Sequence, residues 1–496
     1  MVKQKQGVTS HPPLASEQEV IQFSRCGFSA SQSSGHYLKH LQHALAATQA
    51  ILARLGLSDV IISSGEMKTY YQDDQTYPFG INPFFRYYCP IDGAYHLIHF
   101  SDRKEPHLTI FMPDDFWLVT PNPEDHPRWQ DVTSVMTYEF ATQQQGRLSR
   151  LLTKCSQVGR CIFLGDESDV PEGYECHPPD VIREFGQLRL QKTSWEVLCH
   201  VEATKIALQG HKALEQRFLQ SEPVSERDLY YEYLQATQQT SEEYPYPPII
   251  ALAENGAFLH YNLRGRSKVR SVSFLVDAGA SFAGYASDIS RTYRGSLHHN
   301  NLTDASGQEL RTPPVTLFGE LLAGLTDIQQ TLWPMAVPGQ CFIQLHLKSL
   351  QMIYELLLTM KLIKGPPLSV VAEDDMKAVT RVFYPHGLGH MLGLQVHDVS
   401  FNKESHAAAT QKDLRHQNLL DHGHLFTIEP GIYFIPSLVN QYVKKKLSPD
   451  QPTIALSLVE SLYPFGGIRV EDNIYLTREG IPLNVTRLVE KHLQNL

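Results

Sequence analysis

The chain has no run of 18 apolar residues and no apolar core of signal-peptide length in its first segment, MVKQKQGVTSHPPLASE. A membrane-spanning helix and a secretory leader are therefore not expected. The sequence also lacks any long block of one charge sign, although its formal net charge is -10. This pattern argues against nucleic acid or a membrane surface as the main partner and favours a small, solvated substrate.

Cysteine is scarce, with seven residues that are widely scattered and never spaced as CxxC. An odd, scattered set does not suit a disulfide framework or a cysteine zinc site. We therefore predict a protein of the cytoplasm, where thiols stay reduced.

A chain of 496 residues is too long for one ordinary hydrophobic core, so at least two domains are expected. Residues 1–35 are rich in Ser, Gln and His and are predicted to form a flexible tail that contributes little to a core. Residues 36–190 combine a helical pattern with the strand-like segments VIISS, YHLIHF and HLTIFM, which predicts a small α/β domain.

A second domain is predicted over residues 191–496. Thr193 or Ser194 followed by Glu196 marks the cap of a long amphipathic helix. Beyond it, strands in SVSFLVDAG, HLFTIEPGIYFI and GGIRVEDNIYLT alternate with helical stretches near 315–332 and 344–363, which indicates an α+β fold. The polar stretches 295–314 and 440–453 are predicted to be surface insertions.

Two aspartates stand in the segment DAGASFAGYASDISRTY. An alternating apolar strand ends at Asp277, glycines permit a turn, and a second strand runs through Asp288. If the turn lies midway, the two side chains face each other across a hairpin, with Cβ atoms about 4.5–5.5 Å apart. That separation suits two carboxylates that hold metal ions about 3.5–4 Å from each other. Two exposed hairpin aspartates are the competing explanation.

Three histidines lie within twelve residues of PHGLGHMLGLQVHD, namely His386, His390 and His397. Neutral imidazole binds metal or carries protons near neutral pH, and the intervening glycines permit close backbone approach. A chance cluster is the alternative, because the chain holds 23 histidines.

Two glutamates complete a candidate metal site. Glu429 ends an otherwise apolar strand, where a carboxylate facing the core needs a cation or another partner. Arg469 and Glu471 share one strand face, so an internal ion pair competes with metal binding there. Both roles can coexist if Arg469 orients a ligating Glu471.

Four carboxylates and one imidazole form a hard, oxygen-rich ligand set. Such a set favours Mn²⁺ or a similar ion over thiolate-loving metals, and its charge calls for more than one dication. Water between two such ions becomes hydroxide near neutral pH, and the ions polarise a carbonyl. The predicted reaction is hydrolysis.

Together these motifs resemble the pita-bread metallopeptidases, a family that includes methionine aminopeptidase, aminopeptidase P, prolidase and the non-metal creatinases. Within it the chain most resembles the bacterial Xaa-Pro dipeptidases, some of which are called organophosphorus acid anhydrolases, through QDDQTYPFGINPFF, HGLGHMLGLQVHD and PFGGIRVEDNI. The resemblance covers residues 36 to about 490. It implies an N-terminal creatinase/prolidase-like α/β domain followed by a C-terminal pita-bread catalytic domain.

The resemblance implies two divalent metal ions per subunit, predicted to be Mn²⁺, with ligands Asp277, Asp288, His390, Glu429 and Glu471. Of these, Asp288 and Glu471 are implied to bridge the two ions. The implied catalytic residues are His260, His397 and Glu429. The implied substrate-binding residues are His386, Arg415, Arg469 and Asp74, with Arg415 at the proline carboxylate and Asp74 reaching the site of the second subunit in a homodimer.

The implied activity is hydrolysis of the peptide bond before the C-terminal proline of Xaa-Pro dipeptides by a two-metal-activated hydroxide. Aminopeptidase P activity on longer Xaa-Pro peptides and promiscuous organophosphorus ester hydrolysis are the enzymatic alternatives. A metal-free binding module with the same fold is the alternative from another class. Ser290 departs from the Thr usual in this family, and Val399, Ser400 and Phe401 replace the usual VGG beside the pocket.

Overall fold

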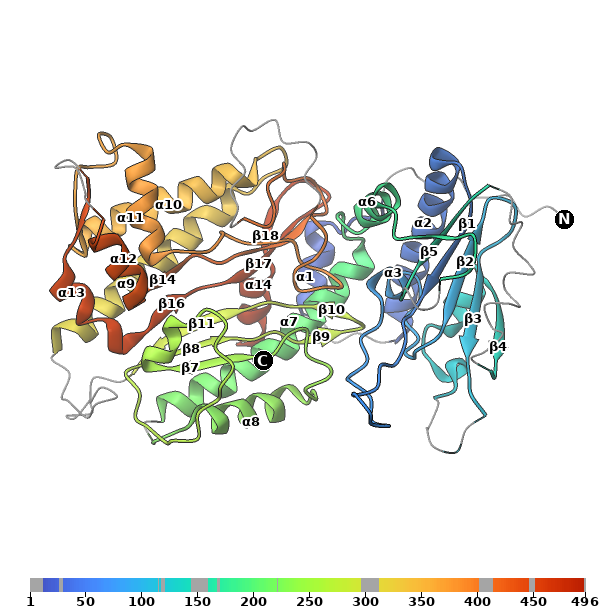
Figure 1. Cartoon of the computed structure of the whole chain (residues 1–496), viewed down its shortest axis with the longest axis horizontal. Coiled ribbons are helices and arrows are strands. Elements are labelled where there is room, and N and C mark those ends of the chain that lie inside the picture. Colours follow the sequence, from blue (N-terminus) through green and yellow to red (C-terminus); the bar gives the residue numbers. More distant parts are fainter. Residues whose placement is uncertain are drawn as a thin grey trace. The chain divides into compact units, whose positions relative to one another are not determined.

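The computed structural model describes residues 12–25, 30–114, 116, 121–143, 159–166, 170–220, 222–295, 312–400, 414–445 and 451–494. These residues form two compact units, one of residues 12–15 and 30–199 and one of residues 16–25 and 200–494 (Figure 1). Within the described ranges, no helix is both long and apolar enough to cross a membrane.

The N-terminal unit is built on a six-stranded sheet in the order β4-β3-β2-β1-β5-β6. Its strands are β1 (Leu57–Ser63), β2 (Leu97–Ser101), β3 (His107–Phe111), β4 (Thr137–Ala141), β5 (Arg160–Leu164) and β6 (Glu175–Cys176). Strands β1, β2 and β3 are antiparallel neighbours, whereas β4, β5 and β6 each pair in parallel with their neighbours. The predicted segments VIISS, YHLIHF and HLTIFM form β1, β2 and β3.

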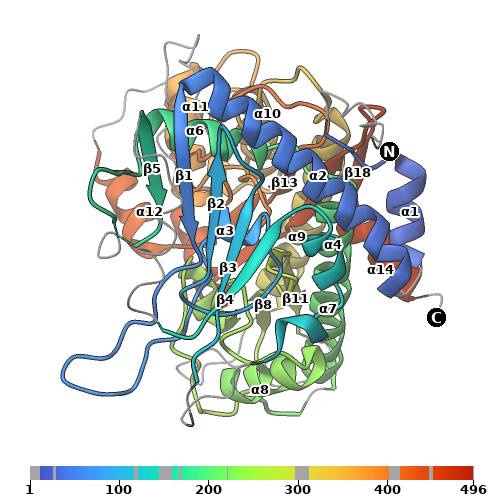
Figure 2. The same cartoon turned by 90° about the vertical axis from the view of Figure 1, so that its right-hand side faces the viewer.

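Helices accompany this sheet: α2 (Ala30–Leu55), α3 (Pro83–Arg86), α4 (Trp129–Thr133), α6 (Pro179–Leu188) and the 3-10 turn η1 (Pro123–Asp125). Helix α2 packs against β1 and β2 (Figure 2). Ile61, Leu97 and Phe163 form a buried cluster on neighbouring strands, because alternate side chains of a strand share one face.

Helix α7 (Ser194–Leu219) runs from the last residues of the N-terminal unit into the C-terminal unit. Its predicted cap is present at Thr193. The Glu196 carboxylate accepts hydrogen bonds from the Thr193 N–H (2.9 Å) and hydroxyl (3.1 Å), and the Glu196 N–H donates to the Thr193 hydroxyl (3.5 Å). This reciprocal arrangement is a capping box, which fixes where the helix starts.

The C-terminal unit contains three-stranded sheets β11-β8-β7 and β13-β17-β18 and three two-stranded ladders. Its strands are β7 (Ile249–Leu252), β8 (Ser273–Asp277), β9 (Ser281–Phe282), β10 (Tyr285–Ala286), β11 (Ser290–Arg294), β12 (Ile363–Lys364), β13 (Leu425–Ile428), β14 (Gly431–Tyr433), β15 (Thr453–Ile454), β16 (Gly467–Arg469), β17 (Asp472–Leu476) and β18 (Pro482–Asn484). Its helices are α1 (Glu17–Arg25), α7, α8 (Glu226–Thr237), α9 (Thr312–Leu332), α10 (Phe342–Thr359), α11 (Glu373–Phe383), α12 (Pro436–Val443), α13 (Leu456–Glu460) and α14 (Val485–Leu493), with 3-10 turns η3 (Ala253–Ala257), η4 (Trp333–Met335) and η5 (Tyr463–Phe465). This mixed content confirms the α+β fold class.

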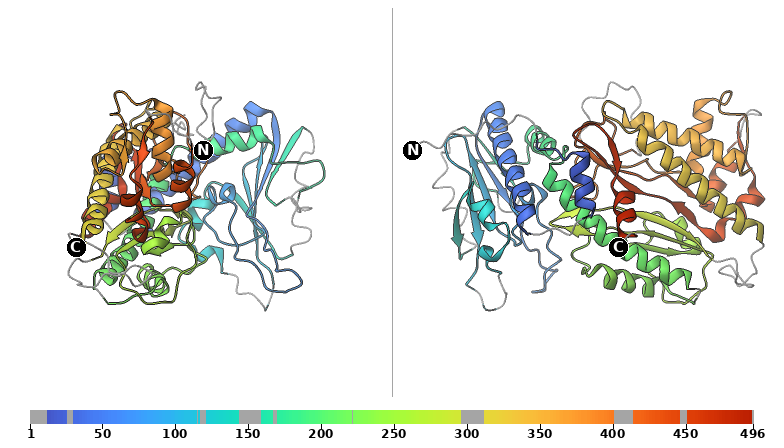
Figure 3. Two further views of the ribbon diagram at one scale, coloured as in Figure 1. Left: turned by 60° about the vertical axis from the view of Figure 1, so that its left-hand side comes forward. Right: turned by 180° about the vertical axis from the view of Figure 1, so that it is seen from behind.

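Helices flank the strands of this unit, with α7 and α8 beside β7 and β8, and α9 and α10 packed on each other (Figure 3). Leu214 of α7, Tyr233 of α8 and Phe274 of β8 belong to one buried cluster. Leu275, on the opposite face of β8, packs instead with Tyr433. Strand β8 therefore turns one face to the helical layer and the other to the interior between the sheets.

Helix α1 departs from the predicted tail at residues 1–35. Val20 and Phe23 of this helix are buried, and the Lys205 ammonium donates to the Phe23 carbonyl oxygen (2.7 Å). The Ser24 hydroxyl lies 2.8 Å from Nδ1 of His492 in α14. Two apolar side chains at helical spacing are enough for a short helix to pack against other helices. The polar composition of residues 1–35 hides this pair, so the prediction of a tail missed the helix.

The predicted insertion at 295–314 falls largely outside the described residues, which omit 296–311. The predicted insertion at 440–453 is mostly described, since only 446–450 lie outside. Its first residues end helix α12, where Tyr442 is buried, so this stretch does not lie wholly on the surface. The described cysteines form no disulfide with one another: Cys89, Cys161, Cys176, Cys199 and Cys341.

Candidate active site

A cavity of about 310 Å³ lies in the C-terminal unit. Ten of the eleven predicted site residues line it, so motifs far apart in the sequence converge here: His260, Asp277, Asp288, His386, His390, His397, Arg415, Glu429, Arg469 and Glu471. The remaining one, Asp74, lies on an exposed loop of the N-terminal unit and does not line this cavity.

The two aspartates lie on either side of the predicted turn, but their register differs from the expected one. The turn is midway, at Ala283 (φ +51°) and Gly284 (φ +85°), between the short strands β9 and β10. Asp277 pairs with Ser290, so Asp288 lies two residues nearer the turn and is not directly opposite Asp277. The two carboxylates nevertheless lie close together, since both contact the same hydroxyl group. The Tyr246 hydroxyl donates to Asp277 Oδ1 (2.8 Å) and is also within hydrogen-bonding distance of Asp288 Oδ1.

The glycine before His390 allows close backbone approach. A Cβ atom on Gly389 would lie 2.0 Å from the Thr427 carbonyl oxygen, so only glycine fits against β13. His390 Nδ1 lies 3.1 Å from the Met391 carbonyl oxygen. This hydrogen bond places the proton on Nδ1 and leaves Nε2 free to bind a cation.

The two glutamates reach the cavity from strand ends. Glu429 follows the buried strand β13, and its N–H donates to the Leu388 carbonyl oxygen (2.8 Å). Glu471 lies between β16 and β17 and is 2% exposed. The Ser290 hydroxyl donates to Glu471 Oε2 (2.6 Å), so the serine that replaces the usual threonine supplies the same hydroxyl group.

Arg469 does not form the ion pair with Glu471 that its strand position suggested. Its Nη2 donates to Asp277 Oδ2 (2.6 Å), and its Nε donates to the Ser290 hydroxyl (3.0 Å). Ser290 thereby connects Arg469 to Glu471. The two-residue strand period correctly predicted that Arg469 and Glu471 share a face. It could not show that the Asp277 carboxylate of β8 lies closer to the Arg469 guanidinium.

The carboxylates repel one another inside the protein. Burial, together with Asp288 and Glu429, raises the pKa of Glu471 well above its usual value. Burial also raises the pKa of Glu429, to about 7, although His390 opposes the shift. Asp288 has a pKa raised by burial as well, against the effect of His390. Such a cluster is relieved when positive charge enters.

The donor atoms fit a divalent cation. One ligand atom from each of Asp288, His390 and Glu471 lies within 4.8 Å of the other two. His390 Nε2 is 3.4 Å from Asp288 Oδ2 and 3.6 Å from Glu429 Oε1. Oxygen and imidazole ligands around like-charged, buried carboxylates match the preference of hard dications.

The remaining histidines differ in their accessibility. His260 and His397 are exposed, as is Arg415, so all three are open to a ligand in the cavity. His386 instead has partners on both ring nitrogens, since Nδ1 lies 2.8 Å from the Gly387 carbonyl oxygen and Nε2 lies 2.9 Å from the Tyr433 hydroxyl. Direct substrate contact, which the sequence assigned to His386, would require one of these bonds to open.

Sequence reasoning missed two tyrosines. Tyr246 joins Asp277 to Asp288, and Tyr433 accepts a hydrogen bond from Arg469 Nη1 (2.7 Å) while contacting His386. Tyr433 lies at a buried strand position in the segment that begins with Glu429. Because Glu429 was predicted to reach the site, its short spacing from Tyr433 could have indicated that Tyr433 lies near the site too. Among the residues expected beside the pocket, Val399 and Ser400 are partly buried, and Phe401 lies outside the described residues.

Comparison with known proteins places both parts of the chain. The profile of metallopeptidase family M24 matches residues 199–478, and that of the Xaa-Pro dipeptidase N-terminal domain matches residues 35–185. A protein of Shewanella woodyi named Xaa-Pro dipeptidase is 34% identical over 459 residues, covering 89% of this chain and 96% of the relative. One of the same name from Shewanella loihica is 34% identical over 436 residues, covering 86% and 91%.

Solved structures share the fold at lower identity. Proline aminopeptidase P II from Yersinia pestis is 19% identical with a TM-score of 0.65, covering 92% of this chain and 100% of that one. Zinc-substituted aminopeptidase P of E. coli in complex with product is 18% identical with a TM-score of 0.63, covering 92% and 98%. The expected order of an N-terminal prolidase-like domain and a C-terminal pita-bread domain is confirmed. By its M24 profile match and its dipeptidase relatives, the chain belongs to the metallopeptidases of family M24.

Proposed function

We propose that this protein is an Xaa-Pro dipeptidase that hydrolyses the bond before a C-terminal proline. The observation that carries the proposal is the convergence of four carboxylates, His390 and Arg415 in one cavity. The N-terminal domain match and the names of the relatives support the dipeptidase activity over the aminopeptidase P activity named for the more distant structures.

The proposed cofactor is a pair of divalent ions, with Mn²⁺ as the expected metal. The ions would be held by Asp277, Asp288, His390, Glu429 and Glu471. When bound, such ions supply positive charge that polarises a carbonyl and acidifies water.

The chain's own side chains have distinct proposed roles in hydrolysis. Glu429 would accept a proton from the attacking water and return it to the proline nitrogen as the peptide bond breaks. His260 and His397 would donate hydrogen bonds to the substrate carbonyl as negative charge develops on its oxygen. Arg415 binds the proline carboxylate through its guanidinium. Arg469 is proposed to help bind the substrate while its hydrogen bond holds the Asp277 carboxylate in place. His386 is proposed to support Arg469 through Tyr433, which contacts both residues.

These roles suit a dipeptide that ends in proline. The bond before proline is a tertiary amide without an N–H, so the site needs no acceptor for one. A longer peptide would place a neutral amide instead of a carboxylate beside the Arg415 guanidinium. The guanidinium charge would then be unpaired, which would oppose binding of the longer peptide.

The test compares a Xaa-Pro dipeptide with a tripeptide that has an internal proline, in protein stripped of metal and then supplied with Mn²⁺, Co²⁺ or Zn²⁺. We expect metal-dependent cleavage of the dipeptide and at least about tenfold slower cleavage of the tripeptide. Preference for the tripeptide would favour aminopeptidase P activity. Binding of the dipeptide without turnover under every metal would favour a binding module.

We also propose a homodimer in the cytoplasm, in which Asp74 contacts the substrate bound by the other subunit. The odd number and wide scatter of the seven cysteines support a reducing compartment. The exposure of the loop around Asp74 leaves it available to a second subunit. Light scattering tests the dimer. A monomeric and fully active enzyme would contradict it.

A further inference from the structure

The strand ends next to Asp288 and Glu471 meet at a short junction. Ser290 of β11 and Glu471, just before β17, form an isolated bridge, in which the Glu471 N–H donates to the Ser290 carbonyl oxygen (3.1 Å). Asp288 lies two residues before Ser290. The distance between Asp288 and Glu471 therefore depends on how firmly this junction is held.

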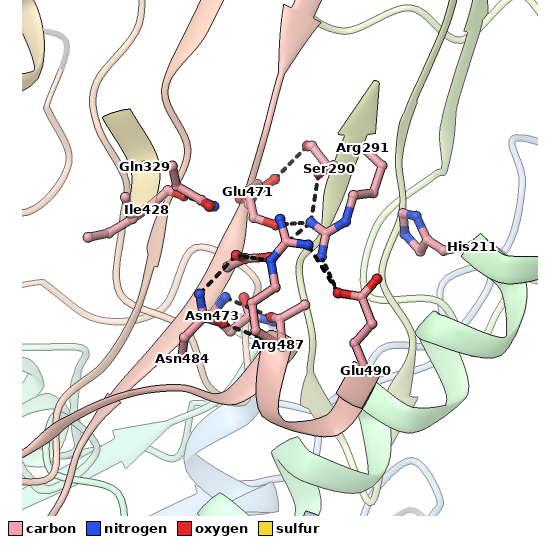
Figure 4. A network of polar contacts seen from close by, with 12 residues as sticks. His211, Ser290, Arg291, Gln329, Ile428, Glu471, Asn473, Asn484, Arg487 and Glu490 are labelled. Carbon is pink, nitrogen blue, oxygen red and sulfur yellow. Dashed lines mark hydrogen bonds and ion pairs between the residues drawn. The ribbon is translucent and has the colours of Figure 1, made fainter. Parts of the chain in front are cut away.

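Arg291 reinforces the junction from the side away from the Ser290 hydroxyl. Its Nη1 donates to the carbonyl oxygens of Ser290 (3.0 Å) and Glu471 (2.8 Å), one on each side of the junction (Figure 4). The same nitrogen lies 2.9 Å from Asp472 Oδ1. The Arg291 side chain is 10% exposed and that of Asp472 is fully buried, so water does not screen this pair.

Helix α14 holds Arg291 and Asp472 in place. Asp472 Oδ2 accepts hydrogen bonds from Asn484 Nδ2 and from Arg487 Nε, both at 2.9 Å. Glu490 Oε2 lies 3.1 Å from Arg487 Nη1 and 3.6 Å from Arg291 Nη2 (Figure 4). Two arginines and two carboxylates thus alternate in a network with no net charge, which avoids an unpaired buried ion.

We propose that Arg291, Asp472, Arg487 and Glu490, which we call the junction network, are positioning residues that set the separation of Asp288 and Glu471 and thereby the metal affinity of the site. This inference rests on the proposed metal centre. None of the four side chains lines the cavity, so they act through the backbone of Ser290 and Glu471. Metal ligands need placement within about 0.5 Å, and loss of an outer partner commonly costs about 10–100-fold in affinity.

The test measures Mn²⁺ binding to the metal-free full-length chain by electron paramagnetic resonance of the free ion. Arg291→Lys keeps the charge, but the lysine side chain is one bond shorter and has no second nitrogen to face Glu490 while the first contacts the carbonyl oxygens. Arg487→Gln removes one partner of Asp472. We expect the dissociation constant for Mn²⁺ to rise about 10–100-fold in Arg291→Lys and about 3–10-fold in Arg487→Gln. Arg478→Gln, in the exposed turn after β17, is the matched control and should bind Mn²⁺ as the wild type does.

Dipeptide hydrolysis by both variants should return to near the wild-type rate at saturating Mn²⁺, a result that general loss of folding would not give. Arg487 is 34% exposed, so its variant is expected to stay folded, which the thermal midpoint checks. Wild-type Mn²⁺ affinity in both folded variants would overturn the inference. A wild-type chain that binds Mn²⁺ but does not cleave Xaa-Pro would instead refute only the dipeptidase proposal.

Discussion

At the scale of single residues, two hydroxyl groups organise the carboxylates of the cavity. The Tyr246 phenol has one proton but lies within hydrogen-bonding distance of Asp277 and Asp288. Ser290 donates to Glu471 while accepting from Arg469. Each hydroxyl therefore links two charged groups and limits how far they can separate.

Replacement of Tyr246 by Phe is expected to lower kcat/KM on a Xaa-Pro dipeptide by about 10–100-fold, because Asp277 and Asp288 lose their common partner. The matched control is Tyr244→Phe, which removes a hydroxyl bonded to Thr237 instead (2.8 Å). Steady-state kinetics at fixed Mn²⁺ measure both variants. Equal losses in the two would contradict a special role for Tyr246.

Asp288→Asn and Glu471→Gln are each expected to lower hydrolysis more than about 100-fold, beyond the effect usual for outer partners of a metal ligand. Each change also removes one of several buried carboxyl groups whose ionisation is opposed by burial and by mutual repulsion. The metal-free variants should therefore melt no lower than the metal-free wild type, while the stabilisation by added Mn²⁺ disappears. Unchanged activity in either variant would refute the assignment.

The sequence predicts the carboxylates of this site because each interrupts or ends an apolar strand, as Glu429 does after β13. It does not predict Tyr246, which lies 31 residues before Asp277 in a proline-rich segment with no local pattern. The sequence also does not predict that Arg469 binds Asp277, because strand periodicity relates residues of one strand and Asp277 lies in another.

At the scale of elements, apolar alternation and helix caps predicted the central strands and helices. The Thr193 capping box and strands β1, β2 and β3 appear where expected. Strand β4 was not predicted, because it lies at a sheet edge and its side chains are largely exposed, which weakens the alternation. The β8–β11 register also escaped prediction, since strand patterns allow neighbouring alignments that differ by two residues.

Helix α2 carries a histidine that should make stability depend on pH. His40 Nε2 lies 2.8 Å from the Tyr87 carbonyl oxygen, and burial lowers the pKa of His40 from 6.5 to about 4. The neutral form is favoured in the folded state, so this stabilisation is present above pH 6.5 and is lost as the pH falls toward 4. The full loss is on the order of 3 kcal/mol.

Thermal midpoints of the wild type and His40→Gln between pH 7.5 and 4.5 measure this effect. The variant should be less stable at pH 7.5 and show a shallower decline, because it has no proton to take up at that position. Parallel curves for the two proteins would contradict the assignment.

At the scale of the whole molecule, the proposed metal site belongs to one of two compact units. A ligand that binds only the folded form stabilises it by about 2.7 kcal/mol at a concentration of 100 times its dissociation constant. In calorimetry, Mn²⁺ should therefore raise the transition of the C-terminal unit and move that of the N-terminal unit much less. A single transition that shifts as a whole would contradict this expectation and show that the units unfold as one.

Helix α1 bears on the order in which the chain can complete its fold. It comprises Glu17–Arg25, yet its contacts are with α7 and with α14, the helix at Val485–Leu493. During synthesis α1 thus lacks part of its docking surface until α14 has been made. Since domains generally fold as units while the chain emerges, the N-terminal unit can fold first. The C-terminal unit, whose junction network includes Arg487 and Glu490 of α14, reaches its final structure only after α14 has been made.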